Sequence, residues 1–372
     1  MKKRGKICAA ALCAAMVMAA AGCGAQSGET VAAGSAAGAE NAVSEENETE
    51  VSEDSAAEEI SQESGEEAPL EDVTVILDYV ANTNHTGMYV ALDKGYYEEQ
   101  GLNVNIVEPT EGATATLVAV GKGDFGINYQ EDVTIALASE DPLPIKAIAT
   151  LIQHNTSGFV TYADKNITSP ADFEGKTYAG WGGPGESAVL NAVMTQAGAD
   201  FSKLNVITSD GAGFAALENQ VDIMWFYEAW DNIQCELADF PINYMPLREL
   251  DERLDYYTPV IIASDETLEQ NPEMVRRFLA ATEQGYRYAM ENPEESAEIL
   301  HKYAPDYSME LLSRSQAYLA DKYMEDSDTW GTMKDSVWDN YTDFMVEYGV
   351  IDKDIPAADC YTNEFLPSAD AQ

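Results

Sequence analysis

Aromatic residues that could bind a flat ligand gather in the second half of the chain. Trp181 lies in a glycine-rich run before Glu186, and Trp225, Tyr227 and Trp230 follow in one short segment. Flat ring faces suit a flat heteroaromatic ligand. Trp181 favours a binding role because glycines flank it in a predicted loop. Trp225 and Trp230 fit a hydrophobic core equally well, since a ring on a strand is normally buried.

Acidic and amide residues accompany these rings. Glu186 follows a Gly- and Pro-rich turn at the start of a predicted helix, where the helix dipole stabilises a negative charge. The same carboxylate could instead accept a charge-assisted hydrogen bond from an exocyclic amine or a protonated ring nitrogen. Gln130, Glu131 and Glu228 could add acceptors, although acids are abundant throughout this chain.

A polar run follows the first predicted strand. Residues 73–78 read as a buried strand because apolar, largely β-branched residues follow one another almost without interruption. In an open α/β sheet, ligands bind beyond the carboxyl ends of the strands, which is where the polar residues 82–85 come. Asn82 and Thr83 fit a helix cap equally well, since Asn and Thr often accept hydrogen bonds from the first amides of a helix.

Predicted strands and helices alternate after residue 73. Strands are expected at 73–78, 104–107, 125–129, 145–152, 177–180, 206–207, 221–225 and 258–263, with helices between them and mainly helices afterwards. This alternation implies an α/β protein with mostly parallel sheets and helices on both faces. We expect two lobes joined by a double crossover hinge, with the late helices packing on the first lobe. Lobe 1 would comprise residues 73–160 plus 262–368, and lobe 2 residues 161–261.

The N-terminal segment has the features of an export signal. Basic residues precede an apolar run that closes with Ala-Ala-Gly before Cys23, so residues 1–22 are predicted to be a secretory signal peptide. Cleavage would free Cys23 for lipid attachment, although an ordinary signal peptide with an incidental cysteine is the alternative. Residues 23–72 contain many acids and almost no large apolar side chain, which predicts a disordered acidic tether. We therefore expect a lipid-anchored protein on the extracytoplasmic face of the cell membrane.

Composition narrows the range of partners. The 372 residues contain 66 Asp and Glu against 20 Lys and Arg, a formal net charge of −46. Nucleic acid is not an expected partner, because its phosphates need Lys and Arg to neutralise them. Besides Cys23, the mature chain has Cys235 and Cys360, and their number alone leaves a disulfide open. No metal-ligand spacing occurs among the cysteines and histidines, so neither a metal nor a cofactor is expected.

Several segments resemble one group of transport proteins. Residues 91–104 (ALDKGYYEEQGLNV), 120–126 (VGKGDFG) and 271–279 (NPEMVRRFL) are similar to two-lobed, type II periplasmic binding proteins of the aliphatic-sulfonate, nitrate and thiamin-precursor type. Within that group, residues 78–87 (DYVANTNHTG), 129–131 (YQE), 180–186 (GWGGPGE) and 225–230 (WFYEAW) resemble the binding proteins for formylaminopyrimidine, a thiamin breakdown product that ABC importers salvage. The resemblance covers essentially everything after the tether. The family usually has Trp-x-Pro at residues 79–81 and Ser at position 183, where this chain has Tyr-Val-Ala and Gly. The first difference changes the size of one stacking ring, and the second changes the loop before Glu186.

The resemblance implies a monomeric solute-binding lipoprotein that is not an enzyme. It would capture a thiamin-related aminopyrimidine and deliver it to the permease subunits of an ABC importer. The ligand-binding residues implied by the resemblance and by the patterns above are Tyr79, Asn82, Asn84, His85, Tyr129, Gln130, Trp181, Glu186, Trp225, Tyr227 and Glu228.

Two alternatives remain open at this point. The first keeps the role and changes the cargo to riboflavin, a sulfonate or another small aromatic molecule. An anionic cargo is disfavoured because the motif loops offer carboxylates and rings instead of Arg and Lys. The second is a related pyrimidine synthase of the same fold, whose family carries a dense cysteine cluster for iron that this sequence lacks.

Overall fold

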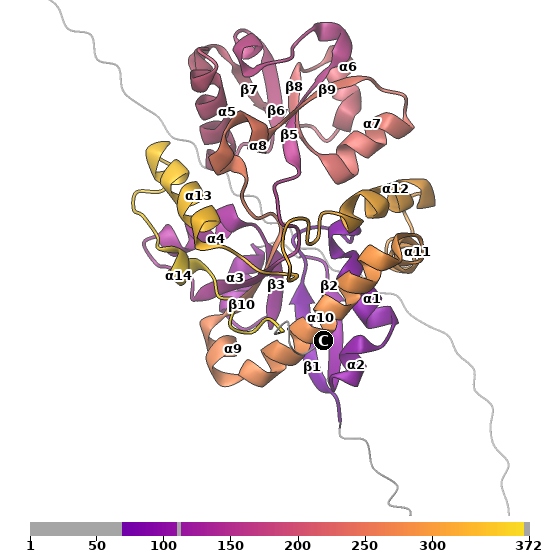
Figure 1. The fold of residues 1–372 in the computed structure, drawn as a ribbon. Coiled ribbons are helices and arrows are strands. Elements are labelled where there is room, and N and C mark those ends of the chain that lie inside the picture. Colours follow the sequence, from indigo (N-terminus) through magenta and orange to yellow (C-terminus); the bar gives the residue numbers. More distant parts are fainter. Residues whose placement is uncertain (1–68, 110–112, 368–372) are drawn as a thin grey trace, which may run out of the picture. The chain divides into compact units, whose positions relative to one another are not determined.

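Two β-sheets, each flanked by helices, organise the described part of the chain (Figure 1). The computed structural model describes residues 69–109 and 113–367. The predicted signal peptide, Cys23 and nearly all of the predicted tether therefore lie outside the described residues. Both sheets belong to a single structural unit. No helix in the described ranges is long and apolar enough to cross a membrane.

The first sheet has the strand order β2-β1-β3-β10-β4. Its strands are β1 (Glu71–Ile76), β2 (Leu102–Val107), β3 (Phe125–Asn128), β4 (Ile145–Thr150) and β10 (Val260–Ser264). β1 pairs in parallel with β2 and β3, whereas β10 is antiparallel to both β3 and β4. Val73, Val75 and Ile76 are buried, as the apolar run predicted.

The second sheet repeats this arrangement in the order β7-β6-β8-β5-β9. Its strands are β5 (Ser157–Tyr162), β6 (Thr177–Gly180), β7 (Asn205–Thr208), β8 (Ile223–Tyr227) and β9 (Ile242–Pro246). β6 is parallel to β7 and β8, and β5 is antiparallel to β8 and β9. The predicted α/β fold is confirmed, and each sheet is mixed because one strand, β10 or β5, runs against the other four.

Fourteen α-helices are assigned in the described ranges. They are α1 (Thr86–Asp93), α2 (Tyr96–Glu99), α3 (Thr114–Ala119), α4 (Gln130–Ala138), α5 (Pro184–Gln196), α6 (Ala216–Asn219), α7 (Ile233–Leu237), α8 (Leu247–Leu250), α9 (Asp265–Gln270), α10 (Pro272–Glu291), α11 (Pro293–Tyr303), α12 (Met309–Ala320), α13 (Asp335–Glu347) and α14 (Ala357–Cys360). Helices α1 and α10 pack so closely that a Cβ atom at Gly285 would lie 2.0 Å from the carbonyl oxygen of Gly87. This contact fixes the start of α1, directly after the polar run.

Helix α13 contributes to the cores of both sheets. Trp338 packs in a cluster with Val260 and Ile262 of β10, whereas Tyr341 and Phe344 pack in a cluster built on the second sheet. Helix α13 thus packs on the first sheet, as expected of the late helices, and also on the second sheet, which was not expected. Its apolar face is long enough to cover both cores, which periodicity alone does not reveal.

The chain passes between the sheets twice, between β4 and β5 and again before β10. Because β5 lies in the second sheet and β10 in the first, sheet membership favours lobe boundaries just before Ser157 and Val260, a few residues earlier than the sequence suggested. The division into two lobes remains a proposal. Cys235 and Cys360 are both buried and free, in different hydrophobic clusters, so the disulfide left open by the sequence is not formed.

Candidate ligand-binding site

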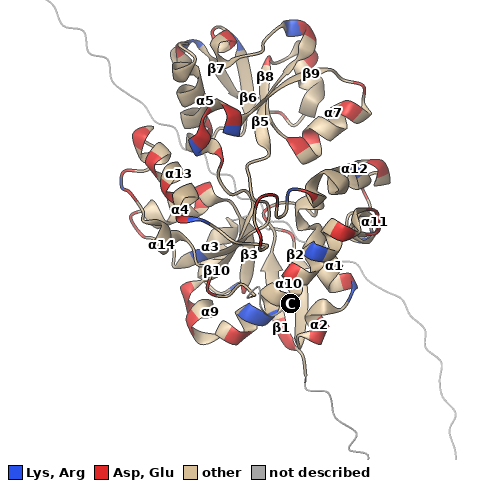
Figure 2. Cartoon of the chain, in the orientation of Figure 1, with Lys and Arg blue, Asp and Glu red and all other residues tan. Residues whose placement is uncertain are grey.

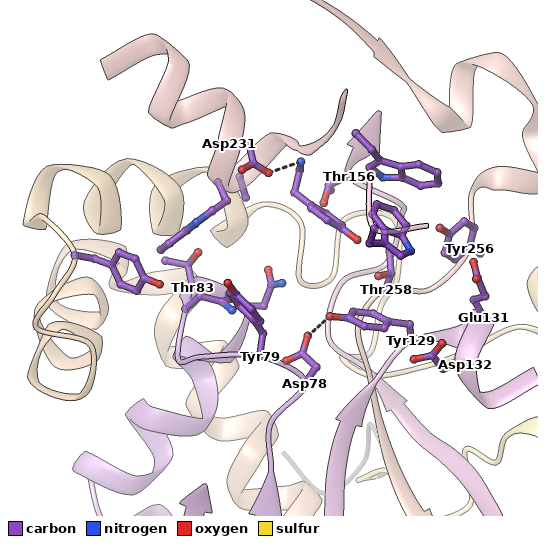
Figure 3. A pocket seen from close by; sticks show the side chains of 18 residues that line it. Asp78, Tyr79, Thr83, Tyr129, Glu131, Asp132, Thr156, Asp231, Tyr256 and Thr258 are labelled. Atoms are coloured by element: carbon purple, nitrogen blue, oxygen red, sulfur yellow. Dashed lines mark hydrogen bonds between the residues drawn. The ribbon is translucent and has the colours of Figure 1, made fainter. Parts of the chain in front are cut away.

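A cavity of about 640 Å³ lies where strand ends of both sheets meet (Figure 3). From the first sheet, Asp78 and Tyr79 follow β1, and Tyr129 follows β3. From the second sheet, Trp181 follows β6, and Tyr227 ends β8. These are carboxyl ends of parallel strands, where α/β proteins bind ligands.

Seven of the eleven predicted ligand-binding residues line the cavity: Tyr79, Asn82, Asn84, Tyr129, Trp181, Trp225 and Tyr227. The other four, His85, Gln130, Glu186 and Glu228, are not among the lining residues. Ligand contact by the seven remains a prediction. For the other four, the hydrogen bonds described below favour a positioning role.

Asp78 connects His85 to Tyr129. Its Oδ1 lies 2.7 Å from Nε2 of His85, and its Oδ2 accepts a hydrogen bond from the hydroxyl of Tyr129 at 2.7 Å (Figure 3). Nδ1 of His85 accepts the backbone N–H of Asn82 at 3.2 Å, so Nε2 is the nitrogen that donates to Asp78. Burial opposes the charge of Asp78, but the electrostatic attraction of His85 and the hydrogen bonds from His85 and Tyr129 hold its pKa below the usual value. Because His85 is fully buried, it orients Asp78 from behind.

Asn82 has the capping role that the sequence left open. Its Oδ1 accepts the backbone N–H of Asn84 at 2.9 Å, and its Nδ2 donates to the carbonyl oxygen of Val80 at 3.0 Å. Asn82 therefore fixes the turn after β1. The side chain of Asn84 is left to face the cavity.

Glu186 holds the loop that carries Trp181. Its Oε1 accepts from the hydroxyl of Tyr178 at 2.5 Å and from the backbone N–H of Trp181 at 3.1 Å, while its Oε2 accepts from the N–H of Gly182 at 2.6 Å. A Cβ atom at residue 180 would lie 1.7 Å from Oε1, so this close approach requires Gly180. The buried carboxylate thereby fixes a loop whose tryptophan ring is 54% exposed.

Gln130 and Glu228 also support the cavity from outside. The amide of Gln130 accepts the N–H of Tyr257 at 2.8 Å and donates to the carbonyl oxygen of Val337 at 3.1 Å, which ties the second chain crossing to the segment at α13. Glu228 accepts a hydrogen bond from the hydroxyl of Tyr318 and lies 3.6 Å from Arg248.

Aromatic rings cover much of the cavity wall. The rings of Trp181 and Trp225 meet edge to face with centroids 5.1 Å apart, and those of Trp230 and Tyr307 do so at 4.8 Å. Tyr79 is 63% exposed, so Tyr79 and Trp181 offer large, uncovered ring surfaces at the ends of strands from different sheets.

The charged residues of the cavity wall are all acidic. Asp78, Glu131, Asp132 and Asp231 line it, and no Lys or Arg is found among its lining residues. Burial raises the pKa of Glu131 and of Asp132, and it raises the pKa of Asp231 to about 6. Asp and Glu also outnumber Lys and Arg on the elements around both sheets (Figure 2).

Several lining residues were missed as predicted contacts: Asp78, Glu131, Asp132, Thr83, Thr156, Ala229, Trp230, Asp231, Tyr256, Thr258 and Tyr307. The strand-end rule could have found Asp78, which closely follows β1. Glu131 and Trp230 were weighed and left out because acids are abundant and rings are usually core. Tyr307, which precedes α12, has no local signal, because only the packing of the late helices brings it to this wall.

The two sheets, the two crossings and the cavity at the strand ends define a type II periplasmic binding protein fold. The alkanesulfonate-binding protein SsuA from Xanthomonas axonopodis pv. citri, solved with bound MOPS, shares this fold. The two structures superpose with a TM-score of 0.60 at 15% sequence identity, over 78% of this chain and 98% of SsuA.

The chain belongs to the NMT1/THI5-like family, whose model matches residues 82–296. The formylaminopyrimidine-binding protein of Halalkalibacterium halodurans is 25% identical over 302 residues, 79% of this chain and 90% of that protein. The 4-amino-5-hydroxymethyl-2-methylpyrimidine phosphate synthase of Legionella pneumophila is 24% identical over 303 residues, 79% of this chain and 92% of the synthase. The resemblance predicted from the motifs is confirmed, and relatives of this chain include both binding proteins and synthases.

Proposed function

We propose that this protein is the extracytoplasmic solute-binding lipoprotein of an ABC importer and that it captures a thiamin-related aminopyrimidine for thiamin salvage. The observation that carries the proposal is the pair Tyr79 and Trp181, two exposed rings that line one cavity from the ends of different sheets. A flat heterocycle between such rings would bury apolar surface on both of its faces. The formylaminopyrimidine-binding relative supports the same cargo class.

Polar groups near these rings suit a ring with amino substituents. Asn84 presents an amide that can both donate and accept hydrogen bonds. The carboxylates of Asp132 and Asp231, when ionised, can only accept them. The predicted signal peptide and the predicted lipidation of Cys23 support an extracytoplasmic location, where capture for an importer takes place.

A pyrimidine synthase is the second candidate, because the Legionella relative is similar over the same share of the chain. The two cysteines in the described ranges do not favour it, since Cys235 and Cys360 are buried in separate hydrophobic clusters away from the cavity wall.

Mass spectrometry of small molecules that co-purify with the native protein tests the cargo directly. Titration calorimetry with formylaminopyrimidine should then give binding with a 1:1 stoichiometry. Incubation with iron and pyridoxal phosphate should yield no pyrimidine product. A pyrimidine product would favour the synthase, and the absence of binding to any aminopyrimidine would contradict the proposed cargo.

A further inference from the structure

We infer that the cavity selects a cationic cargo, a flat heteroaromatic ring that carries an ammonium or amidinium group, over a neutral ring of the same shape. This inference rests on the proposed capture function and specifies the charge of the ligand, which the proposed function leaves open.

The first observation is negative charge without a counterion. Asp231 accepts the backbone N–H of Tyr227 through Oδ2 at 2.9 Å (Figure 3), and both of the hydrogen bonds that lower its pKa come from uncharged backbone groups. Glu131 accepts a hydrogen bond from the hydroxyl of Tyr341 at 2.7 Å. Within residues 69–109 and 113–367, no Lys or Arg forms an ion pair with these two acids or with Asp132.

Asp78 differs from the other three acids, because it already has the ring of His85 at 2.7 Å and the hydroxyl of Tyr129 as partners. Carboxylates that lose water without gaining a cation are costly to keep ionised. The raised pKa of Asp231, about 6, is consistent with that cost. A cationic ligand would supply the missing charge.

Helix dipoles do not remove the need for a cation. Glu131 and Asp132 lie in the first turn of α4, where the amide dipoles favour negative charge. Their pKa values are nevertheless raised, so burial outweighs the helix end. Asp231 comes from the second sheet, in the π-helical turn Glu228–Asn232 that follows β8.

The ring faces provide the second observation. Cations bind to the faces of Trp and Tyr rings, and a cavity that combines such rings with carboxylates favours a positive ligand on two separate grounds. Tyr79 and Trp181 are both more than half exposed at the cavity. A neutral cargo would use the rings and leave Glu131, Asp132 and Asp231 without a countercharge.

A pair of ligands that differ in one charge tests this inference. 4-Amino-5-aminomethyl-2-methylpyrimidine carries an ammonium arm at neutral pH, whereas its N-formyl derivative keeps the ring and has a neutral arm. Titration calorimetry on the full chain at pH 7.5 should show the amine binding about tenfold more tightly or better, the scale of one charge-assisted hydrogen bond. Benzamidine and benzamide form a second pair without a pyrimidine ring and should show the same order.

Variants assign the preference to the cavity acids. Asp231→Asn keeps an oxygen for the N–H of Tyr227 and should weaken binding of the amine by about ten- to a hundredfold, with less than a threefold change for the N-formyl compound. Asp359→Asn removes one charge from an exposed position outside the cavity and should change neither affinity. The affinities of the amine and of the N-formyl compound are compared on the same variant. A loss of folded protein affects both measurements and therefore does not alter their ratio.

The outcomes separate this inference from the proposed function. Tight binding of the N-formyl compound without a preference for the amine would overturn the cationic cargo and keep the aminopyrimidine importer. Binding of benzamidine over benzamide, with neither pyrimidine bound, would keep the cationic cargo and overturn the aminopyrimidine. Equal affinities within both pairs, or no binding of either cation, would overturn the inference.

Discussion

His154 places its Nδ1 2.7 Å from Oδ2 of Asp255, and the two residues lie on the two chain crossings between the sheets. Nε2 of the same ring lies 3.0 Å from Oδ1 of Asp326. The hydrogen bond with Asp255 is the main reason that the pKa of His154 rises from 6.5 to about 8, and Asp326 adds to it. The protonated imidazole therefore ties the crossings to each other and to the segment after α12.

We expect His154→Gln to make the unfolding free energy less dependent on pH. The folded-state pKa exceeds the unfolded value, so the stabilisation is fully present below about pH 6.5 and is lost as the pH rises through about 8. The advantage of the wild type over the variant should be about 1 kcal/mol larger at pH 6 than at pH 9, a modest value because the side chain is partly exposed. Urea unfolding at the two pH values measures it. A difference that does not change with pH would show that the charge of His154 contributes nothing.

Tyr129→Phe should destabilise the protein by about 1–3 kcal/mol. The substitution removes the hydroxyl that donates to Asp78 and leaves a poorly solvated carboxylate with one hydrogen bond fewer. Urea unfolding at pH 7 measures the loss. Tyr361→Phe is a suitable control, since that hydroxyl donates to the exposed residue Asp335 and its removal should cost much less. Equal effects of the two substitutions would contradict the importance of the Asp78 network.

Trp181→Ala and Glu186→Gln should weaken aminopyrimidine binding by different routes. Trp181→Ala removes a ring at the cavity and should cost about 1–3 kcal/mol of binding free energy, with little change in the melting temperature of the unliganded protein. Glu186→Gln replaces an acceptor with an NH2 group opposite the N–H of Gly182 or Trp181, which should loosen the loop.

The melting temperature separates the two routes. Glu186→Gln should lower both the affinity and the melting temperature of the unliganded protein, because the carboxylate is buried and accepts three hydrogen bonds. Calorimetry measures the affinity of each variant, and thermal unfolding measures the melting temperature of each. Unchanged affinity in both variants would remove this loop from the site.

Cys23→Ser should release the protein from the membrane. Cys23 follows the predicted signal peptide, and serine cannot accept the thioether-linked lipid that the sequence predicts. Fractionation of cells that express the wild type and the variant measures the effect, and Cys235→Ser provides a control at a buried thiol. Retention of both variants in the membrane fraction would contradict the lipoprotein assignment.

Local sequence signals predicted most of the fold because they depend on residues that are close in the chain. The run Val73 to Ile76 and the alternation after it identified all five strands of the first sheet and β6, β7 and β8 of the second. No strand was predicted at β5 or β9. The reversed direction of β10 was also missed, since apolar periodicity does not encode strand direction. The dual packing of α13 was missed because it depends on two cores that the chain assembles from distant segments.

Sequence motifs that follow a strand end predicted residues that line the cavity, and other signals did so less often. Tyr79, Tyr129 and Trp181 each follow a strand end and line the cavity. Glu186 and His85 were expected at the ligand, but each uses its polar atoms to hold neighbouring backbone or side chains. Sequence patterns identify residues near a site, but they do not distinguish side chains that line the cavity from side chains that hold the lining residues in place.

Ligand should draw the two sheets of this protein together. The cavity wall takes Tyr79 and Asp78 from the first sheet and Trp181 and Asp231 from the second, so a bound ring that touches both sides gains contacts only when the sides approach each other. Such differential affinity shifts the population toward the closed arrangement, with the conformational change absorbed by the two crossings near His154 and Asp255.

Small-angle scattering and thermal unfolding test this closure on a chain that starts at Pro69, without the predicted tether whose dimensions would mask the change. Saturating aminopyrimidine should reduce the radius of gyration. It should also raise the melting temperature, because a ligand that binds only the folded state stabilises it as its concentration exceeds the dissociation constant. A higher melting temperature with an unchanged scattering profile would keep binding and contradict closure. The same measurements on Trp181→Ala should show a smaller decrease in the radius at equal saturation, since one of the two exposed rings that line the cavity is then missing.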